Sequence, residues 1–409
     1  MSGGLLSLGL TLRRRLLPVP IPSSALPPIQ LLDLRAQHAP IENELNGALQ
    51  QTLAEAAFIQ GPAVGKFAEE LSGYLGGPYV VPCANGTDAL QLAFMSLKLP
   101  AGTEIIVPAF TYVATLEAAA VLGLVPVPAE VQADTFNLDP AAVKAALTPR
   151  TGAIVAVHLF GQCADLAALR SLADEHGVAL IEDNAQAIGA TFTASGATWV
   201  AGTVGEVGTC SFFPSKNLGA LGDGGALFTR DETRAIYLRQ LANHGQTRKY
   251  HHEHVGLNSR LDTLQAALLS VKLRHLPQWT AARQQVAAHY DAALAGIAGL
   301  RIPARDPRST HVFHQYTLTL EEDSPVASFN RRNQLQAYLK QHGIPSAIYY
   351  PLPNHLQPAY HYLGYQTGQF PVAERLCRTV LSLPIHPMLT SEQVAYVSEA
   401  VQSFFRSSL

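Results

Sequence analysis

Charged residues are scarce in this sequence. They make up 14% of its 409 residues, and the net charge is only -3. The chain has neither the basic surplus that nucleic-acid-binding proteins use nor an acidic tail for a basic partner, so neither kind of partner is expected. Scarce charge together with a mean hydropathy of +0.11 favours an apolar surface that another subunit covers.

Cysteine is also scarce. The four cysteines are scattered along the chain and form no C-x-x-C pair: Cys83, Cys163, Cys210 and Cys377. This spacing argues against a disulfide framework and a zinc site, and it fits reduced thiols in a cytoplasmic enzyme. Four histidines lie close together at positions 244, 251, 252 and 254, but their spacing matches no standard zinc pattern. We therefore predict no metal and expect a solvated or substrate-facing loop there.

Long hydrophobic runs are missing. Residues 1–28 begin with a short apolar stretch, which is followed by three arginines at 13–15 and then by five prolines. A signal peptide places its positive charges before the apolar region, and a membrane span needs about 20 apolar residues. We expect a disordered leader over residues 1–28 and no membrane-spanning segment in the sequence.

Strand and helix patterns alternate through the middle of the chain. Residues 152–157 and 178–181 are typical of buried strands, and the segment 165–177 between them has leucines at helical spacing, an Asp at its start and a Gly at its end. This order predicts a mostly parallel α/β sheet with right-handed crossovers. Further strands are expected at 104–107, 125–127 and 226–229, and further helices at 88–97 and 114–122.

The pattern changes after about residue 260. Two long helices are predicted there, followed by two strands on either side of a third helix: 261–276, 281–295, 316–320, 331–342 and 347–350. This mixture is typical of a smaller α+β domain. We therefore divide the chain into the leader 1–28, a large α/β domain of residues 29–275 and a small C-terminal domain of residues 276–409.

Lys216 lies in an unusual setting for a lysine. It is placed between an apolar, strand-like run and a glycine-rich turn, with few charges nearby. A lysine that acts as an amine nucleophile needs such a place, because desolvation lowers its pKa and rigid packing fixes its direction. A surface lysine beside a flexible loop fits the same stretch equally well.

Asp183 follows the strand 178–181, about 30 residues before Lys216. In an open α/β sheet the ligand binds beyond the carboxyl ends of the strands, so this carboxylate is expected in the ligand crevice. A lysine that binds pyridoxal phosphate needs an acidic group to keep the pyridine nitrogen protonated. The alternative is that Asp183 only caps the next turn.

A phosphate site is indicated at the start of the helix 88–97. Gly86 lets the backbone approach an anion closely, and the free amides and dipole of the helix start attract it. The hydroxyls of Thr87 and Ser211 are further donors, and Tyr112 is a candidate to stack on a ring. Taken alone, an ordinary helix cap is the simpler explanation of Thr87, and a core aromatic is the simpler explanation of Tyr112.

Eleven ordered motifs together resemble one known family, the DegT/DnrJ/EryC1/StrS aminotransferases, and they cover about residues 29–405. They lie at 58–62, 85–90, 107–115, 158–162, 182–186, 211–219, 222–225, 243–245, 258–262, 349–353 and 381–384. The resemblance implies a pyridoxal-phosphate aminotransferase of fold type I, with a mostly parallel central sheet and a smaller C-terminal α+β domain.

The resemblance also implies a role for each matching residue around pyridoxal 5'-phosphate. Lys216 would form the internal aldimine, Asp183 would face the pyridine nitrogen, and Gln186 would lie near the ring hydroxyl. The phosphate would be held by three residues, and the ring would be stacked by a fourth: Gly86, Thr87, Ser211 and Tyr112.

A homodimer with shared active sites is implied as well, because Asn258 would reach the phosphate bound by the neighbouring subunit. The substrate would lie near four further residues: Lys249, Tyr250, Arg260 and Tyr349. The implied reaction moves an amino group from an amino acid, glutamate, to a nucleotide-linked keto sugar in amino sugar and polysaccharide biosynthesis. A keto cyclitol, a dehydration or elimination on the same cofactor, and a non-catalytic regulatory role are the alternatives. Relatives that dehydrate replace the lysine by histidine, so Lys216 favours transamination.

Overall fold

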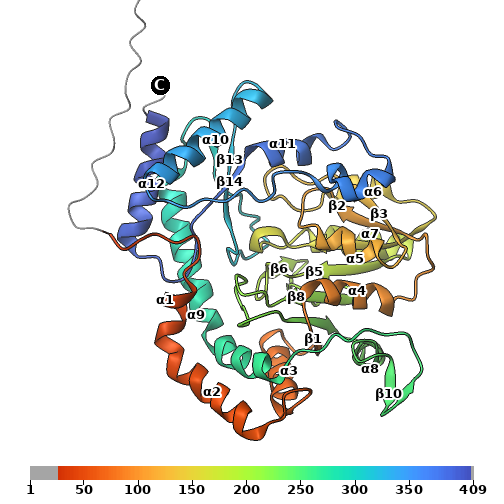
Figure 1. The fold of residues 1–409 in the computed structure, drawn as a ribbon. Helices are drawn as coiled ribbons and strands as arrows, with labels where there is room; N and C mark the ends of the chain where they lie inside the picture. Colours follow the sequence, from red (N-terminus) through yellow and green to blue (C-terminus); the bar gives the residue numbers. More distant parts are fainter. Residues whose placement is uncertain (1–25, 407–409) are drawn as a thin grey trace, which may run out of the picture.

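The computed structural model describes residues 26–406 (Figure 1). Most of the predicted leader therefore lies outside the described residues. Within residues 26–406 there is no helix that is both long enough and apolar enough to cross a membrane.

A seven-stranded sheet forms the centre of the molecule, in the order β1-β9-β8-β5-β4-β2-β3. Five neighbouring strands run parallel: β8 (Val207–Ser211), β5 (Ala179–Asp183), β4 (Thr151–Val157), β2 (Glu104–Pro108) and β3 (Val125–Ala129). β9 (Gly225–Thr229) pairs antiparallel with both β8 and β1 (Tyr79–Cys83). The predicted mostly parallel α/β sheet is confirmed.

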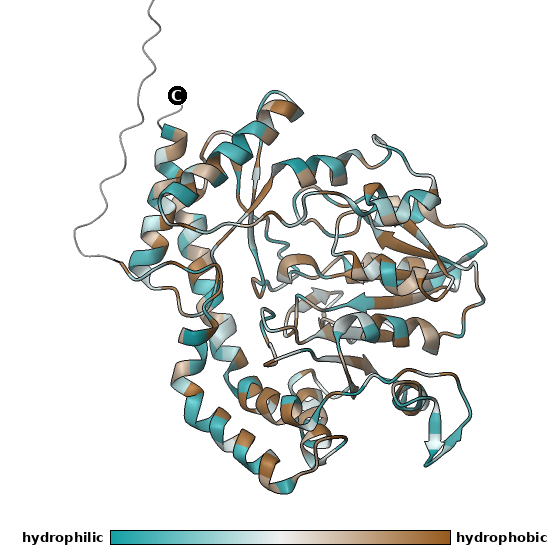
Figure 2. Cartoon of the chain, in the orientation of Figure 1, coloured by the Kyte–Doolittle hydropathy of each residue, from teal (hydrophilic) through white to brown (hydrophobic). Residues whose placement is uncertain are grey.

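Helices cover both faces of this sheet, and successive strand residues pack on opposite sides. Ile105 and Val155 pack with helices α4 (Gly86–Ser96), α5 (Ala114–Ala120) and α8 (Glu232–Leu241), whereas Ile106 and Ile154 pack with α6 (Pro140–Ala146) and α7 (Leu166–His176). Because both faces are covered, strands such as β2 are buried at every position and appear as hydrophobic arrows in Figure 2.

Helix α7 begins and ends where the sequence predicts. The carboxylate of Asp165 accepts a hydrogen bond from the amide of Ala168 at 3.1 Å, and Gly177 ends the helix in the left-handed conformation with φ 64°. The helix thereby returns the chain to β5, which carries Asp183 at its carboxyl end. The caps therefore help to fix where that carboxylate lies.

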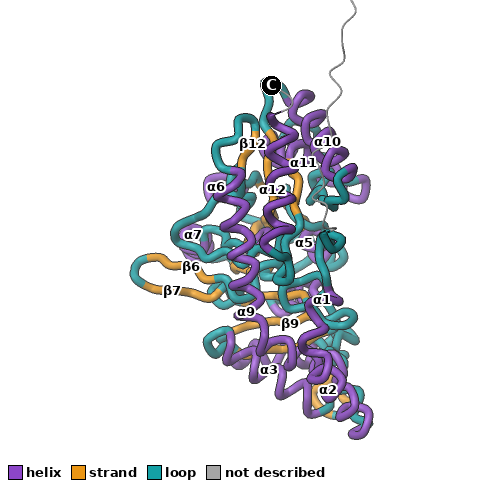
Figure 3. Tube along the Cα trace, turned by 90° about the vertical axis from the view of Figure 1, so that its left-hand side faces the viewer, coloured by secondary structure: helices purple, strands orange, loops and turns teal. Residues whose placement is uncertain are grey.

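A single long helix, α9 (Thr263–Leu294), replaces the two helices predicted at 261–276 and 281–295. Pro277 lies inside it, and a proline removes one backbone hydrogen bond, which is why the sequence suggested a break. Buried side chains on both sides of the proline, including Leu276, Trp279 and Arg283, hold the helix continuous. Figure 3 shows α9 running beside α12 and down toward α3 (Pro62–Tyr74).

The N-terminal helices lie against the first half of α9. α1 (Leu34–His38) and the short η1 (Ala39–Ile41) lead into α2 (Glu42–Glu55), whose Leu45 packs with Leu268 and Val271 of α9. Helix α3 also packs on α9, through Phe67 and Leu71. α9 therefore connects these helices to the rest of the molecule.

The second half of α9 joins the C-terminal unit, by which we mean the sheet β12-β13-β14 and its three helices. The strands are antiparallel, β12 (Leu300–Arg301), β13 (Tyr316–Leu320) and β14 (Val380–Leu383), and the helices are α10 (Pro325–Gln341), α11 (Pro371–Thr379) and α12 (Ser391–Arg406). The strand predicted at 347–350 is wrong. Ala347 makes only an isolated bridge to Ser382, and the chain then leaves the sheet.

The remaining elements are short. Two hairpins project from the body, β6 (Thr191–Ala194) with β7 (Ala197–Val200) and β10 (Gln246–Arg248) with β11 (His251–His252), as Figures 3 and 1 show respectively. Three further 3-10 turns lie at η2 (Leu159–Gly161), η3 (Asn354–Leu356) and η4 (Pro358–Leu363). The proposed domain boundary at residue 275 falls inside α9, so the division into 29–275 and 276–409 stays a proposal.

Candidate active site

A cavity of about 520 Å³ opens beyond the carboxyl ends of β2, β4 and β5. This is the edge at which ligands bind in open α/β sheets. Eight of the residues singled out in the sequence line it, and they come from segments far apart in the chain: Gly86, Thr87, Tyr112, Asp183, Gln186, Ser211, Lys216 and Tyr349. The fold therefore gathers most of the predicted site into one place.

Lys216 is held in the tight turn that follows β8. Its amide donates to the carbonyl of Phe213 at 2.8 Å, and the amide of Ala220 closes the turn by donating to the carbonyl of Phe212 at 2.7 Å. Burial lowers the pKa of the Lys216 amine below its usual range, although the nearby Asp183 and Cys210 oppose this shift. The partly buried lysine thus lines the cavity from a fixed backbone, which favours the nucleophile over the surface lysine.

Asp183 ends β5 and presents its carboxylate to the same cavity. Its Oδ2 accepts a hydrogen bond from the hydroxyl of Thr115 at 2.9 Å, and its Oδ1 accepts from the amide of Ala185 at 3.2 Å. These two donors leave lone pairs of the carboxylate available for a further partner. Asp183 is thus oriented toward the cavity rather than used up as a turn cap.

The neighbouring Glu182 points to the opposite side of the sheet, as expected for successive strand residues. It is fully buried and accepts hydrogen bonds from His158 Nε2 at 3.0 Å and from the amides of Gly202, Val204 and Gly205 at 2.6–2.7 Å. Burial opposes its charged form, but these donors outweigh that effect and hold the pKa of Glu182 below its usual range. Glu182 therefore stabilises the fold on the side of the sheet that faces away from the cavity.

The first turn of α4 forms another wall. The side chain of Asn85 caps the helix by accepting from the amide of Asp88 at 2.8 Å, and Gly86 and Thr87 follow it at the cavity surface. A side chain at Gly86 would bring its Cβ within 2.6 Å of Ser211 Cβ. Only glycine therefore lets the helix start lie against Ser211, and this arrangement brings free amides and two hydroxyls together.

Aromatic side chains close one side of the cavity. The rings of Tyr112 and Tyr350 are 6.0 Å apart, and the Tyr350 hydroxyl accepts a hydrogen bond from Gln186 Nε2 at 3.1 Å. Gln186 Oε1 in turn accepts from the amide of Phe160 at 2.8 Å. Tyr112 is 56% exposed, so its ring is open to a ligand and is not the core aromatic that was the simpler alternative.

Comparison with known proteins gives the same assignment. The family model described as the DegT/DnrJ/EryC1/StrS aminotransferase family matches residues 40–402. The chain belongs to this family. The predicted family, the fold and the aminotransferase class are thereby confirmed.

Similar proteins extend along nearly the whole chain. The UDP-2-acetamido-2-deoxy-3-oxo-D-glucuronate aminotransferase of Pseudomonas aeruginosa is 41% identical over 91% of this chain and 99% of its own length. S. venezuelae DesV, solved in complex with a ketimine intermediate, is also 41% identical, with a TM-score of 0.88 over 93% of this chain and 99% of its own. NtdA of Bacillus subtilis, solved with bound cofactor PMP, is 28% identical, with a TM-score of 0.82 over 92% of this chain and 83% of its own.

Four predicted site residues of this aminotransferase-family chain do not line the cavity. Asn258 and Arg260 lie beside Asn243. The backbone of Asn243 forms an isolated β-bridge with Asn258, and its Oδ1 atom accepts a hydrogen bond from Arg260 Nη1 at 3.2 Å. Lys249 and Tyr250 lie in the β10–β11 hairpin, where the Lys249 ammonium is 5.4 Å from the centre of the Tyr250 ring and Tyr250 is 80% exposed. Within a single copy of the chain, these residues are separate from the cavity.

Sequence reasoning also missed several residues of the cavity and its surroundings. Thr115 binds Asp183 from inside α5, and His314, Gln315 and Tyr350 line the cavity. His314 lies in the segment before β13 and follows every strand of the seven-stranded sheet in the sequence, so no local pattern linked it to Lys216. Tyr349 was expected near the substrate, but the adjacent Tyr350 was not predicted as a site residue.

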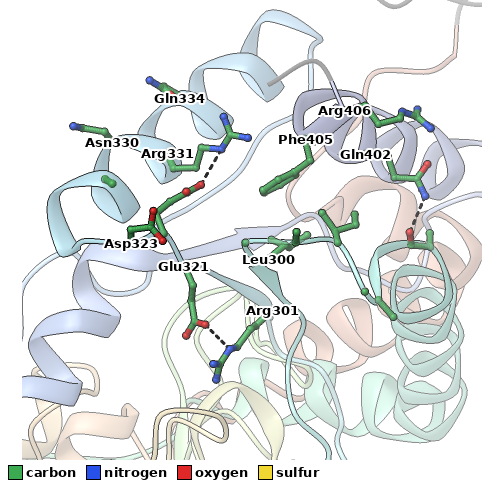
Figure 4. A pocket seen from close by; sticks show the side chains of 18 residues that line it. Leu300, Arg301, Glu321, Asp323, Asn330, Arg331, Gln334, Gln402, Phe405 and Arg406 are labelled. Carbon is green, nitrogen blue, oxygen red and sulfur yellow. Dashed lines mark hydrogen bonds and ion pairs between the residues drawn. The ribbon is translucent and has the colours of Figure 1, made fainter. Parts of the chain in front are cut away.

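A larger cavity of about 1240 Å³ lies in the C-terminal unit between β12, α10 and α12 (Figure 4). Four of its charged side chains form two pairs, since Arg301 binds Glu321 at 2.7 Å and Arg331 binds Glu322 at 3.4 Å. None of the predicted site residues lines it. Within residues 26–406 there is also no group of three or more His, Cys, Asp or Glu side chains placed to hold a metal ion.

Proposed function

We propose that this protein moves an amino group from glutamate to a keto sugar linked to a nucleotide. The proposal is carried by one observation, that Lys216, Asp183 and the first turn of α4 surround a single cavity in a chain of an aminotransferase family. The Pseudomonas relative named above is an aminotransferase for a UDP-linked 3-oxo sugar and matches this chain almost from end to end. That likeness supports a nucleotide sugar as the acceptor.

The cofactor is pyridoxal 5'-phosphate, whose aminated form is the PMP bound by NtdA. The cavity offers what each part of this molecule requires: an amine for the aldehyde, a carboxylate for the ring nitrogen, and amides with hydroxyls for the phosphate. When bound, it supplies an electron sink for the charge that develops when a proton leaves the substrate carbon. The residues present in the structure therefore fit the cofactor.

Lys216 would hold the cofactor by its amine and later act as the acid and base of the reaction. A base must be unprotonated when it is needed, and burial lowers the pKa of this amine below its usual range, which favours that form. Once the donor has displaced it, the free Nζ would carry a proton from the α-carbon of the donor to C4' of the cofactor. The fixed turn from Phe213 to Ala220 would keep the amine within reach of both atoms.

Asp183 would hold a proton on the pyridine nitrogen by charge and hydrogen bonding. The hydrogen bonds from Thr115 and Ala185 fix the carboxylate in one orientation, and a positively charged ring withdraws electrons better than a neutral one. Gln186 would lie near the ring hydroxyl, held there by Phe160 and Tyr350. Tyr112 would stack on the open face of the ring.

Gly86, Thr87 and Ser211 would bind the phosphate. The amides at the start of α4 carry the positive end of the helix dipole, and the cap by Asn85 uses only the amide of Asp88. The hydroxyls of Thr87 and Ser211 would add two neutral donors. Tyr349 lines the same cavity and would contact the substrate.

The active site would be completed by a second copy of the chain. Asn258 would reach the phosphate of the neighbouring subunit, and Lys249, Tyr250 and Arg260 would lie near its substrate. The exposed β10–β11 hairpin, which projects from the body in Figure 1, supports this assignment because its side chains are free to contact another molecule. A homodimer would also cover the apolar residues Phe213 and Leu221, which are exposed in the single chain.

A panel of keto sugar nucleotides tests the proposal. We expect the protein, loaded with pyridoxal 5'-phosphate, to aminate at least one UDP- or dTDP-linked 3-keto sugar with [15N]glutamate and to leave 15N on the sugar. Mass spectrometry of the sugar product and an assay of 2-oxoglutarate check this. The aminated sugar and 2-oxoglutarate should form in equal amounts. Loss of water from the sugar without 15N incorporation would indicate a dehydratase. If 15N were found on a keto cyclitol and on no sugar nucleotide, the proposed acceptor would be wrong and the cyclitol would take its place. A colourless protein that takes up no cofactor would point to a regulatory role.

Mixing two inactive variants tests the shared site. Lys216→Ala and Asn258→Asp place their lesions in the same site of a heterodimer and leave its second site intact. A statistical mixture is therefore expected to regain about a quarter of wild-type activity. The measurement is turnover after the two variants have been unfolded and refolded together. A mixture of Lys216→Ala with the double variant Lys216→Ala/Asn258→Asp serves as the control and should stay inactive. No recovery of activity in the first mixture would contradict a shared site.

A further inference from the structure

The hydroxyl of Tyr350 is a cavity group that the proposed mechanism uses only as a support for Gln186. Both residues line the cavity. The orientation of the Gln186 amide is fixed, because its Oε1 atom accepts a hydrogen bond from the backbone amide of Phe160 at 2.8 Å. Its Nε2 atom must therefore be the one that faces Tyr350, and the Tyr350 oxygen accepts from it at 3.1 Å.

The hydroxyl proton of Tyr350 is not used in this bond. A tyrosine hydroxyl carries one proton, and this proton cannot point at Gln186, whose Nε2 atom is itself a donor. None of the hydrogen bonds among residues 26–406 gives the proton an acceptor. Burial raises the pKa of the Tyr350 hydroxyl above its usual range; the hydrogen bond from Gln186 lowers it, and the negative charge of Asp183 raises it. Tyr350 therefore keeps its proton and has it available for a ligand.

The Tyr350 side chain is held in place by its surroundings. Its ring centre lies 6.0 Å from that of Tyr112. Four residues later in the chain, the amide of Asn354 donates to the carbonyl of Ala109 at 3.1 Å, and its Nδ2 atom donates to the carbonyl of Thr111 at 3.0 Å. The segment that carries Tyr350 is thus fastened to the loop after β2, so the hydroxyl is positioned before a ligand binds.

Two available protons lie side by side at this point of the cavity. The Nε2 atom of Gln186 has two protons and donates one of them to Tyr350. The proposed function places Gln186 near the ring hydroxyl of the cofactor, to which the second proton would be donated. Because this Nε2 atom and the Tyr350 oxygen are only 3.1 Å apart, a single ligand oxygen can accept from both donors.

We propose that Tyr350 donates its hydroxyl proton to the ring oxygen of pyridoxal 5'-phosphate, as a second donor beside Gln186. The inference rests on the proposed function, in which Gln186 lies at that oxygen. Two donors stabilise the negative charge of the ionised ring oxygen. A ring oxygen stabilised in this way attracts a proton on the nearby nitrogen, the one that Lys216 contributes to its double bond with the cofactor, less strongly. Tyr350 therefore lowers the pKa of that nitrogen.

The test is a pH titration of the cofactor-loaded protein, followed by its absorbance. The bound cofactor changes colour when the nitrogen that joins it to Lys216 takes up a proton, and the midpoint of the change gives the pKa of that nitrogen. We expect Tyr350→Phe to raise the midpoint by about one pH unit, the size of one hydrogen bond to a charged group. The midpoint rises because phenylalanine donates nothing to the ring oxygen, whose charge then holds the nearby proton more firmly.

Tyr349→Phe is the matched control. It removes the hydroxyl of the adjacent cavity residue and leaves the bond between Gln186 and Tyr350 in place, so it should not move the midpoint. An equal shift in both variants would overturn the proposal. Tyr350→Met, which also lacks the proton and has a side chain that adapts to irregular space, takes the place of Tyr350→Phe if the latter does not fold.

A structural role for Tyr350 would lower the melting temperature of Tyr350→Phe without moving the midpoint, and that result would overturn the proposal. An unchanged midpoint with a raised KM for the keto sugar would overturn it as well, because the hydroxyl would then bind the substrate. The titration requires no substrate. A failure of the proposed acceptor would therefore appear separately, in the turnover of the wild-type protein.

Discussion

Lys216→Ala is expected to reduce amino transfer by about 10⁴-fold, the upper range for one positioned acid–base group. The variant loses the only amine that this account places at the cofactor, while the amides of α4, Ser211 and Asp183 remain in place. It should therefore still take up the cofactor and retain its fold. Single-turnover assays with glutamate, followed by absorbance, measure the transfer, and equilibrium dialysis measures the uptake.

The outcome that would contradict this assignment is a Lys216→Ala protein that transaminates at the wild-type rate. A protein that loses the cofactor altogether would show instead that Lys216 is needed for binding. Lys272 provides a comparison within the same chain, because it is buried and burial lowers its pKa to about 8. It lies on α9 outside the cavity, so we expect it not to react with the cofactor although its pKa is lowered.

Asp183→Asn is expected to lower kcat by about 10²–10³-fold, as for the loss of one preorganised electrostatic partner. The amide keeps the shape of the carboxylate and can still accept from Ala185, but it cannot hold a proton on the ring nitrogen by charge. The folded state should be nearly as stable as that of the wild type. The rate of the half-reaction with glutamate and the melting temperature check the two parts of this prediction.

Glu182→Gln is the matched control, because it makes the same chemical change one residue earlier, on the other side of the strand. It should leave the half-reaction rate nearly unchanged and cost about 1–3 kcal/mol of unfolding free energy, since a buried hydrogen-bond acceptor of the Gly202, Val204 and Gly205 amides and of His158 is replaced by an amide. The folded-state pKa of Glu182 is depressed, so its stabilising effect is present above the unfolded value near 4.5 and is lost as the pH falls below it. Equal effects of both variants on the rate would contradict the assignment of Asp183.

Much of the fold follows from local pattern. The strands on either side of α7 are buried on both faces and therefore appear as apolar runs, and the helix carries its own caps at Asp165 and Gly177. Asp183 lies at the end of a strand and Gly86 at the start of a helix, and both positions can also be predicted from local sequence. Parallel topology then brings them to one edge of the sheet, which is why the sequence alone could place them together.

The missed features depend on contacts between distant parts of the chain. α9 continues through Pro277 because residues on both sides of it are buried by other elements, and helix propensity contains no such information. The segment 347–350 is apolar and β-like, yet it serves as a cavity wall. His314 is placed at the cavity by hydrogen bonds that its neighbours Val312 and Phe313 make with Gly161, Asn217 and Arg283. These partners lie as far as about 150 residues away in the sequence, so they leave no local signal.

The most direct measurement is reduction of the cofactor-loaded protein with sodium borohydride, followed by peptide mass spectrometry. Borohydride converts the carbon–nitrogen double bond between a lysine amine and the aldehyde carbon of the cofactor into a permanent single bond. The account predicts that the yellow colour disappears and that the reduced cofactor is found on the peptide containing Lys216. Cofactor fixed to Lys272 or to any other lysine, or no fixed cofactor in a protein that transaminates, would contradict it.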